Sequence, residues 1–181
     1  TGKAALTVTG TGDTEIELSG DNTLVSGSGH AGLEKSDTYG SEPSQNGSLT
    51  INAEDPDSSL TATGGTSGAG IGGASHRDSS NITITGGSIT ATAGSNSGSG
   101  RTYCGAGIGG GAYGKGNNIN ITGGTVNATG GEGNSSYHFG GAGIGGGFNS
   151  GANNITISGN DTRVTATGKD GGAGIGGGYA G

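Results

Sequence analysis

Apolar and polar residues alternate in short segments that recur along the chain. Five segments rich in Ile, Leu and Thr follow this pattern: Glu15–Leu18, Leu49–Asn52, Ile82–Thr85, Ile119–Thr122 and Ile155–Ser158. A second, shorter set follows them: Leu24–Ser26, Leu60–Thr63, Ile89–Thr92, Val126–Thr129 and Val164–Thr167. A period of two with β-branched residues predicts half-buried β-strands. No segment has the i, i+3, i+4 apolar spacing of an amphipathic helix, so essentially no helix is expected.

A third segment, Gly-Ala-Gly-Ile-Gly-Gly, completes each unit. It occurs four times: Gly68–Gly73, Gly105–Gly110, Gly141–Gly146 and Gly172–Gly177. Ala31–Glu34 is a degenerate first copy, and the central apolar residues of the five copies are spaced 38, 37, 36 and 31 apart. Such regular spacing indicates a repeat array. We expect Ala and Ile to point inward while the glycines allow neighbouring segments to approach closely.

Each repeat therefore predicts one coil of three short strands. The expected fold is all-β: a right-handed parallel β-helix of about five three-stranded coils, since right-handed connection is the default for parallel strands. We place the coils at about 14–36, 48–74, 80–111, 117–147 and 153–178, within a single β-solenoid domain spanning 1–181. The domain is expected to be a fragment of a larger protein. Leu6–Thr9 has the pattern of an extra strand before the first coil.

Corners and coil-to-coil contacts also have sequence signals. Three glycine pairs that follow strands are expected to supply positive φ angles: Gly86-Gly87, Gly123-Gly124 and Gly130-Gly131. Three asparagines occupy the same position before the first strand of successive coils: Asn81, Asn118 and Asn154. Stacked asparagines can bond through their amides, so an asparagine ladder is predicted.

Composition narrows the classes of function. Glycine supplies 48 of 181 residues and only 27% are hydrophobic, but two prolines and the lack of a Gly-X-Y period exclude collagen. The net charge of −7 and the scattered Lys and Arg residues argue against nucleic-acid binding. The single cysteine cannot form an internal disulfide. No apolar run is long enough to insert into a membrane, so export and anchor signals are expected outside this segment.

The repeat motifs resemble those of a known group of surface proteins. NITITGG at 81–87, SITATAG at 88–94 and the GAGIGG copies are similar to GAGIGGG-type β-solenoid repeat regions of large Gram-positive bacterial surface proteins. HAGLEKS at 30–36 looks like the first repeat of such regions, and the resemblance runs from about Thr14 to Gly181. It implies an extracellular, cell-surface location beside adhesive or carbohydrate-active modules. It brings no catalytic residues.

Several motifs invite chemistry, but their context favours simpler interpretations. GAGIGG satisfies the dinucleotide pattern G-x-G-x-x-G, yet it recurs four times and no helix is expected after it. Gly109–Lys115 partly matches a phosphate loop, but Gly116 replaces the magnesium-binding Ser or Thr. A solvated turn is favoured over a calcium site at Glu54–Asp57. We therefore expect no cofactor and no metal.

An enzyme is not expected either. The outward strand positions carry mainly Thr and Asn, which offer no proton donor of suitable pKa, so we assign no catalytic residue. The histidines are expected to be solvated loop residues in different coils: His30, His76 and His138. Cys104 lies beside a glycine motif and is expected to be a buried small residue.

Two sets of residues are candidate binding surfaces. The first is a group of loop residues that could stack against and bond sugar rings: Arg101, Tyr103, Tyr113, Tyr137, His138, Phe139 and Phe148. Tyr179 follows the third strand in the same way as Tyr113 and Phe148. The alternative is that the rings cover the glycine-rich third sheet and stabilise the stack by packing on one another.

The second set is a surface array on the second strands: Thr61, Thr63, Thr90, Thr92, Thr129, Thr165 and Thr167. Flat Thr-x-Thr arrays can match ordered water, as in ice-binding proteins. The alternative is that Thr simply favours solvent-facing strand positions. Asn127 interrupts the rows, and Val25 and Gly27 are expected to break them in the first coil.

Together these patterns predict a non-enzymatic repeat segment of a bacterial surface protein, acting as an adhesin stalk or display scaffold. One alternative is a module that binds glycans or host surface molecules through the loop aromatics. Another is an ice-binding protein. End-to-end self-association through open coil edges is a further expectation.

Overall fold

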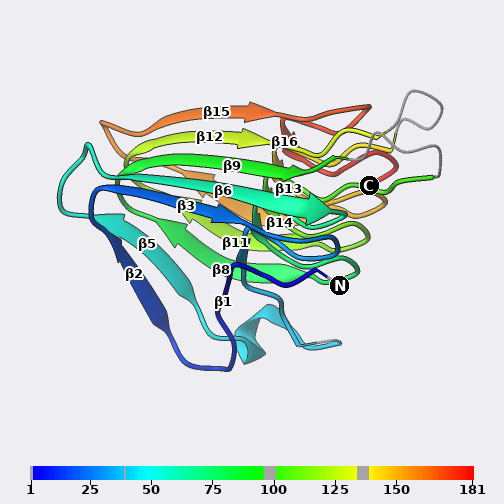
Figure 1. Ribbon diagram of the computed structural model, residues 1–181, viewed down its shortest axis with the longest axis horizontal. Helices are drawn as coiled ribbons and strands as arrows, with labels where there is room; N and C mark the ends of the chain where they lie inside the picture. Colours follow the sequence, from blue (N-terminus) through cyan, green and yellow to red (C-terminus); the bar gives the residue numbers. More distant parts are fainter. Residues whose placement is uncertain (1, 39, 96–100, 134–138) are drawn as a thin grey trace.

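The computed structural model describes residues 2–38, 40–95, 101–133 and 139–181, which form a parallel β-helix (Figure 1). Its strands lie in three sheets, and successive coils add one strand to each sheet. A single turn of 3-10 helix, η1 (Pro43–Gln45), is the one helical element among these described residues. The prediction of an all-β solenoid with three-stranded coils is confirmed.

Every strand pairs in parallel with its equivalent in the next coil. The first sheet contains β2 (Thr14–Leu18), β5 (Leu49–Ala53), β8 (Ser79–Ile84), β11 (Gly116–Ile121) and β14 (Ala152–Ile157). The second contains β3 (Asp21–Val25), β6 (Ser59–Thr66), β9 (Ser88–Gly94), β12 (Thr125–Thr129) and β15 (Arg163–Thr167). The third contains β1 (Leu6–Thr7), β4 (Leu33–Glu34), β7 (Ile71–Gly72), β10 (Ile108–Gly109), β13 (Ile144–Gly145) and β16 (Ile175–Gly176). The extra strand expected near Leu6 is thus present as β1, paired with β4.

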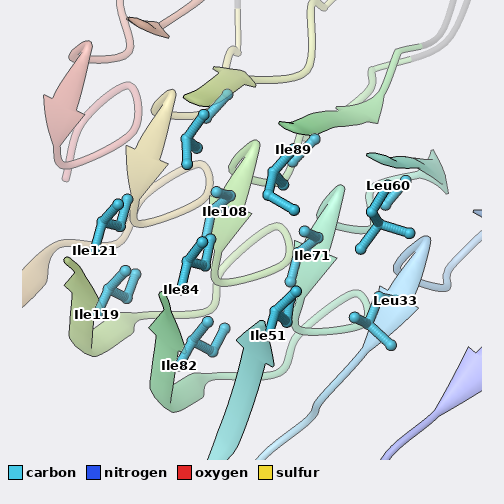
Figure 2. Close-up of a cluster of buried hydrophobic side chains, with 14 of the residues drawn as sticks. Leu33, Ile51, Leu60, Ile71, Ile82, Ile84, Ile89, Ile108, Ile119 and Ile121 are labelled. Atoms are coloured by element: carbon cyan, nitrogen blue, oxygen red, sulfur yellow. The ribbon is translucent and has the colours of Figure 1, made fainter. Parts of the chain in front are cut away.

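The core is a set of aliphatic columns that run through the stack. In the third sheet Leu33, Ile71 and Ile108 pair in register and are fully buried (Figure 2). The alanines two residues earlier, such as Ala69 and Ala106, are fully buried as well, so the inward placement of Ala and Ile is confirmed. Burying each Ile side chain contributes about 1.5–3 kcal/mol of transfer free energy. Small residues suffice because each coil has only a narrow interior to fill.

The second strand of the first coil is shifted relative to the expectation. β3 begins at Asp21, and its register pairs Asn22 with Leu60 and Leu24 with Ala62. The two predicted segments Leu24–Ser26 and Leu60–Thr63 therefore do not align at their first apolar residues, contrary to what their equivalence in the repeat had implied. A larger residue fits at Leu24 because β3 has a neighbouring strand on one side only. The side-chain amide of Asn22 donates to backbone carbonyls, including that of Ser59 at 3.1 Å, which satisfies its polar group in the aliphatic column.

The glycine pairs supply positive φ only in part. Gly87 and Gly124 have φ angles of 83° and 78°, as expected for the corner after the first strand. The same expectation for Gly130 and Gly131 is wrong, since neither has a positive φ. A Cβ on Gly130 would lie 2.1 Å from the carbonyl oxygen of Gly141. Glycine is needed there because two backbone segments approach closely, and not because of its φ range.

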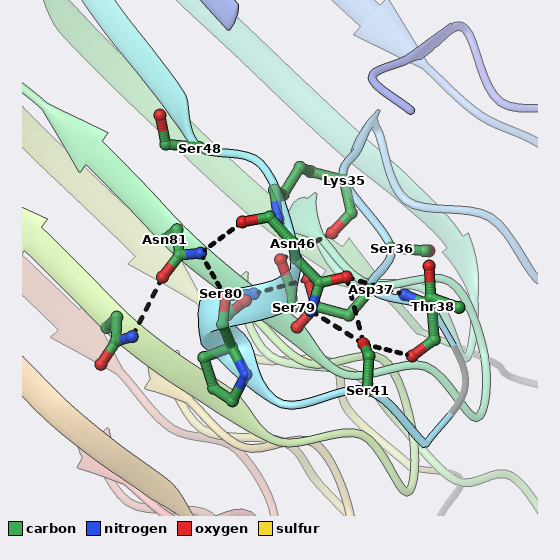
Figure 3. A network of polar contacts seen from close by, with 12 residues as sticks. Lys35, Ser36, Asp37, Thr38, Ser41, Asn46, Ser48, Ser79, Ser80 and Asn81 are labelled. Atoms are coloured by element: carbon green, nitrogen blue, oxygen red, sulfur yellow. Dashed lines mark hydrogen bonds and ion pairs between the residues drawn. The ribbon is translucent and has the colours of Figure 1, made fainter. Parts of the chain in front are cut away.

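The predicted asparagine ladder is confirmed. The amide of Asn154 donates to Oδ1 of Asn118 at 3.0 Å, and the amide of Asn118 donates to Oδ1 of Asn81 at 3.0 Å. The amide of Asn81 then donates to the carbonyl oxygens of Pro43 and Asn46 at 2.7 and 3.0 Å (Figure 3). All three ladder residues have φ between 51° and 57°, a left-handed conformation that Asn adopts more readily than most residues. The ladder thus joins three coils and the connection after the first coil.

Candidate functional site

The threonine array lies on the outer face of the second sheet. Thr61, Thr90, Asn127 and Thr165 form one column, and Thr63, Thr92, Thr129 and Thr167 form the next. Neighbouring strands in a sheet are about 4.8 Å apart, which sets the spacing along each column. The shifted register of β3 places Thr23 beside Thr61 and Val25 beside Thr63. The expectation that Gly27 interrupts the rows is therefore wrong, while Val25 does interrupt one and is 66% exposed.

The loop aromatics form one cluster at the corner beside the third sheet. The ring of Tyr103 stacks on Phe139 and Phe148, with centroids 5.3 and 4.6 Å away, and meets Tyr113 edge-on at 5.0 Å. Phe148 also stacks on Tyr179 at 6.1 Å. The sequence suggested two separate loop columns, but the structure merges them. Tyr137 and His138 lie outside the described residues.

A repeated turn positions part of this cluster. His76, Tyr113, Asn149 and Ala180 are each five residues after the central Ile of a glycine motif and have φ between 55° and 64°. Backbone amides there donate to the next coil, as Tyr113 does to Phe148 at 2.9 Å. The ring of His76 stacks on Tyr113 with centroids 4.8 Å apart, a contact that was not predicted from the sequence. The fixed spacing after each GAGIGG motif was the signal that could have shown it.

The rings of the cluster cover one another. Tyr103, Tyr113, Phe139 and Phe148 are half-buried, whereas Tyr179 is 41% exposed. Burial raises the pKa of Tyr113 to about 12, helped by its side-chain hydrogen bond with Tyr103 and opposed by the charge of Arg101. Mutual stacking of this kind stabilises neighbouring coils, with each aromatic pair contributing about 0.5–1.5 kcal/mol. This arrangement supports the structural interpretation of the aromatics.

Alkaline titration should reveal the environment of Tyr113. Below pH 10 the tyrosine is protonated in both the folded and the unfolded chain, so its contribution to stability is complete. As pH rises from about 10 to about 12, the unfolded chain loses this proton first, and the folded state loses stability. Tyrosinate absorbance should therefore show a late component near pH 12 that Tyr113→Phe removes. Tyr179→Phe is the control variant for the effect of removing a phenol elsewhere in the cluster. A late step that persists in Tyr113→Phe would contradict the assignment.

Cys104 is a fully buried free cysteine, as expected. Burial raises the pKa of its thiol to about 12, with smaller contributions from the negative charges of Asp170 and Glu132. A thiol with such a pKa is almost entirely protonated at neutral pH, and the thiolate is the nucleophile. Cys104 therefore fills space between coils.

A charged cavity of about 580 Å³, which was not predicted from the sequence, lies beside the first coil. Nδ1 of His30 lies 2.7 Å from a carboxylate oxygen of Glu34, and Nζ of Lys35 lies 3.0 Å from Oδ1 of Asp37. Lys35 and Asp37 have side chains only 5% and 4% exposed. The feature of the sequence that could have indicated this cavity is the replacement of GAGIGG by a charged sequence in the first repeat.

The glycine motifs do not form phosphate-binding loops. In the second, third and fourth coils the GAGIGG glycines pack against backbone: a Cβ on Gly107, for example, would lie 2.5 Å from the amide nitrogen of Thr129. Gly109 is the last residue of β10, and residues 110–115 form a loop that leads into β11, so the segment is a loop, as expected, apart from its first residue. Within the residues that the structure describes, no group of three or more His, Cys, Asp or Glu side chains is placed to hold a metal ion. No helix in the described ranges is long and apolar enough to cross a membrane.

Comparison with known proteins agrees with the geometry. A family model described as a β-helix repeat matches residues 57–75, 119–148 and 155–179. No curated protein and no solved structure matches this chain. The match and the observed coils together define a β-helix repeat region.

Proposed function

We propose that this chain is a non-enzymatic scaffold segment of an extracellular bacterial surface protein, acting as a stalk or display element. The observation that carries the proposal is the continuous parallel pairing of equivalent strands in all three sheets, which is interrupted in β6 by one register shift between Thr63 and Thr66. The asparagine ladder and the aromatic cluster add side-chain contacts between the same coils. Such a stack holds its surfaces at set distances, which is what a spacer requires.

The outer surface is consistent with display. Connections between the second and third strands differ in length between coils: residues 67–70 join β6 to β7, residues 95–107 join β9 to β10, and residues 130–143 join β12 to β13. The third strands themselves keep their register. Variable loops on a constant framework are typical of proteins that present different contacts on one scaffold. The proposed location on a bacterial cell surface rests on the resemblance of the repeats to those of surface proteins. Glycans or host surface molecules are the proposed partners of the whole protein.

Spin-label distances should test the scaffold. Thr23 and Thr165 lie in one column, four coil steps apart, so labels at Thr23→Cys and Thr165→Cys should report one narrow distance distribution. The Cα atoms there should be about 19 Å apart. Cys104→Ala removes the native thiol from the labelled protein. A broad distribution in native buffer would contradict a rigid spacer.

The proposed location on the cell surface needs a separate test. Antibodies raised against this chain should label intact cells of the source organism, and protease treatment of those cells should remove the label. Labelling that appears only after cell lysis would contradict a surface location.

A second candidate function is ice binding by the threonine array. The observation in its favour is that two outward columns stay in register over four successive coils with one interruption, Asn127. If the array binds ice, the protein should show thermal hysteresis that Thr92→Lys abolishes, because the lysine would stand in the middle of the flat face. Thr83→Lys on the outer face of the first sheet is the matched control and should retain activity. A wild-type protein without hysteresis or ice shaping would exclude this function.

A further inference from the structure

The first coil departs from the others at one position in the third sheet. Register places Glu34 opposite Gly72, so Glu34 and Lys35 occupy the places of Gly72 and Gly73 in the second coil. The three later coils also have a glycine pair at this position. In the second coil, a Cβ on Gly73 would lie 2.3 Å from the carbonyl oxygen of Arg77. Side chains are therefore excluded from this place by the tight turn that follows.

A different path of the chain makes room for the charged side chains. After β4 the chain runs through η1 before it reaches β5 at Leu49, whereas β7 is followed directly by the short turn to β8. The longer connection surrounds the cavity of about 580 Å³ together with the segment after β1. Its lining includes Val8, Thr9, Gly12, Thr38, Asn46 and Ser48, in addition to the charged residues and Ala74.

The charges of the cavity balance. Glu34 and Asp37 are negative, Lys35 and Arg77 are positive, and His30 is neutral at pH 7 in the formal count. Two of these groups form the buried pair Lys35–Asp37, and Glu34 accepts from the ring or backbone of its neighbours, including the amide of Ala31 at 3.4 Å. Oδ1 of Asp37 also accepts from the backbone amide of Ser80 at 3.2 Å. Because desolvating charges costs free energy even when they are paired, stability alone does not account for charged side chains at this place. The glycine pairs of the later coils serve the same strand position without charge.

We propose that this cavity binds one neutral, polyhydroxylated sugar unit, such as a hexose or an N-acetylhexosamine. The paired charges leave no net charge to attract an ion, but they retain lone pairs and N–H groups that can bond hydroxyls. Hydroxyl side chains at Thr9, Thr38 and Ser48 add further partners, and Val8 and Ala74 add apolar contact. The side-chain amide of Asn46 shapes this wall, since it accepts from the backbone amide of Thr38 and donates to the carbonyl oxygen of Glu42. The volume lies within the range of about 300–1,000 Å³ that small-molecule sites have. The unit is either a free sugar or the terminal residue of a glycan.

Saturation-transfer NMR on the full chain tests the proposal. The probes are glucose, galactose, N-acetylglucosamine and N-acetylgalactosamine, each as the free sugar and as the terminal unit of a β-linked disaccharide. Glucose 6-phosphate and glucuronic acid are the anionic comparisons. At least one neutral sugar should receive saturation from the protein and the anionic forms should bind at least about tenfold more weakly, a difference of about 1.4 kcal/mol. Transfer to the disaccharides would identify a glycan end as the ligand, and transfer to free sugars alone would identify a monosaccharide.

Two tyrosine substitutions locate the binding. Gly12 lines the cavity, and a Cβ built there has no atom within 4 Å, so Gly12→Tyr should fill the cavity without disturbing the fold. Gly151 is equally open but lies outside the lining, which makes Gly151→Tyr the matched control. Gly12→Tyr should weaken sugar binding at least about tenfold, and Gly151→Tyr should leave it unchanged. Absence of transfer to every neutral sugar, equal binding by Gly12→Tyr, or tighter binding of the anionic sugars would overturn the proposal.

Discussion

Gly109→Val is expected to abolish cooperative folding of the chain. Gly109 has φ of 131°, which L side chains rarely adopt, and a Cβ there would lie 2.1 Å from the carbonyl oxygen of Gly145. The clash is with backbone of the next coil, so it cannot be relieved by turning a side chain. We expect a loss of more than about 4 kcal/mol, comparable with the whole stability of many domains. Circular dichroism during thermal unfolding, together with limited proteolysis, measures the effect.

Gly151→Val provides the control for this prediction. A Cβ on Gly151 has no heavy atom within 4 Å, and Gly151 does not have a positive φ. Its substitution should shift the free energy of unfolding by about 0.5 kcal/mol or less, as most surface changes do. If Gly109→Val unfolded like the wild type, the close approach of β10 and β13 would not be a requirement of the fold.

Asn118→Ala is expected to lower the free energy of unfolding by about 3 kcal/mol. Asn118 is the middle residue of the ladder: it donates to Asn81 and accepts from Asn154, each at 3.0 Å. Losing two hydrogen bonds costs about 1 kcal/mol each, and placing Ala at φ of 51° costs about 1–2 kcal/mol more. Urea denaturation followed by circular dichroism measures the difference.

Two further variants separate these contributions. Asn118→Gly removes the amide but tolerates the left-handed backbone, so it should cost about 2 kcal/mol, less than alanine. Asn120→Thr lies on the same strand in a column with Thr83 and Thr156, and its effect should be close to zero. Equal losses for alanine and glycine at Asn118 would show that backbone strain contributes nothing. No loss for either would show that the ladder does not stabilise the stack.

The aromatic cluster and the charged cavity, both candidate sugar-binding regions, differ in how many of their groups already contact other groups of the protein. In the aromatic cluster, Tyr103 and Phe148 present their faces to one another and to neighbouring rings, which leaves little free ring surface for a sugar. In the charged cavity, space remains beside the paired groups. Glycan binding by the loop aromatics stays a prediction, which Tyr103→Ala and Phe139→Ala test against immobilised mucin. If the two variants bound mucin as the wild type does, the aromatic cluster would not be the glycan-binding site, and the charged cavity would remain as the candidate site.

Much of the fold follows from the spacing of similar residues along the chain. In a stack of parallel coils, each residue lies next to its own equivalents, so the recurrence of Ile71, Ile108 and Ile144 already implies that these residues touch. The alternation of apolar and polar residues then determines which side chains face inward. Asn81, Asn118 and Asn154 could be recognised as a ladder for the same reason.

Features that depend on the path between strands could not be obtained from the repeat pattern. The register of Asn22 and Leu24 depends on where β3 starts. Because β3 lies at the edge of its sheet and pairs only with β6, either Asn22 or Leu24 can lie opposite Leu60. The aromatic cluster brings together loops that precede and follow the third strands, and strand periodicity carries no information on that meeting. The cavity at Glu34 and Lys35 exists because the connection through η1 runs wide of the coil. Repetition thus determines contacts between equivalent residues, whereas contacts between non-equivalent segments arise only when the chain is folded in three dimensions.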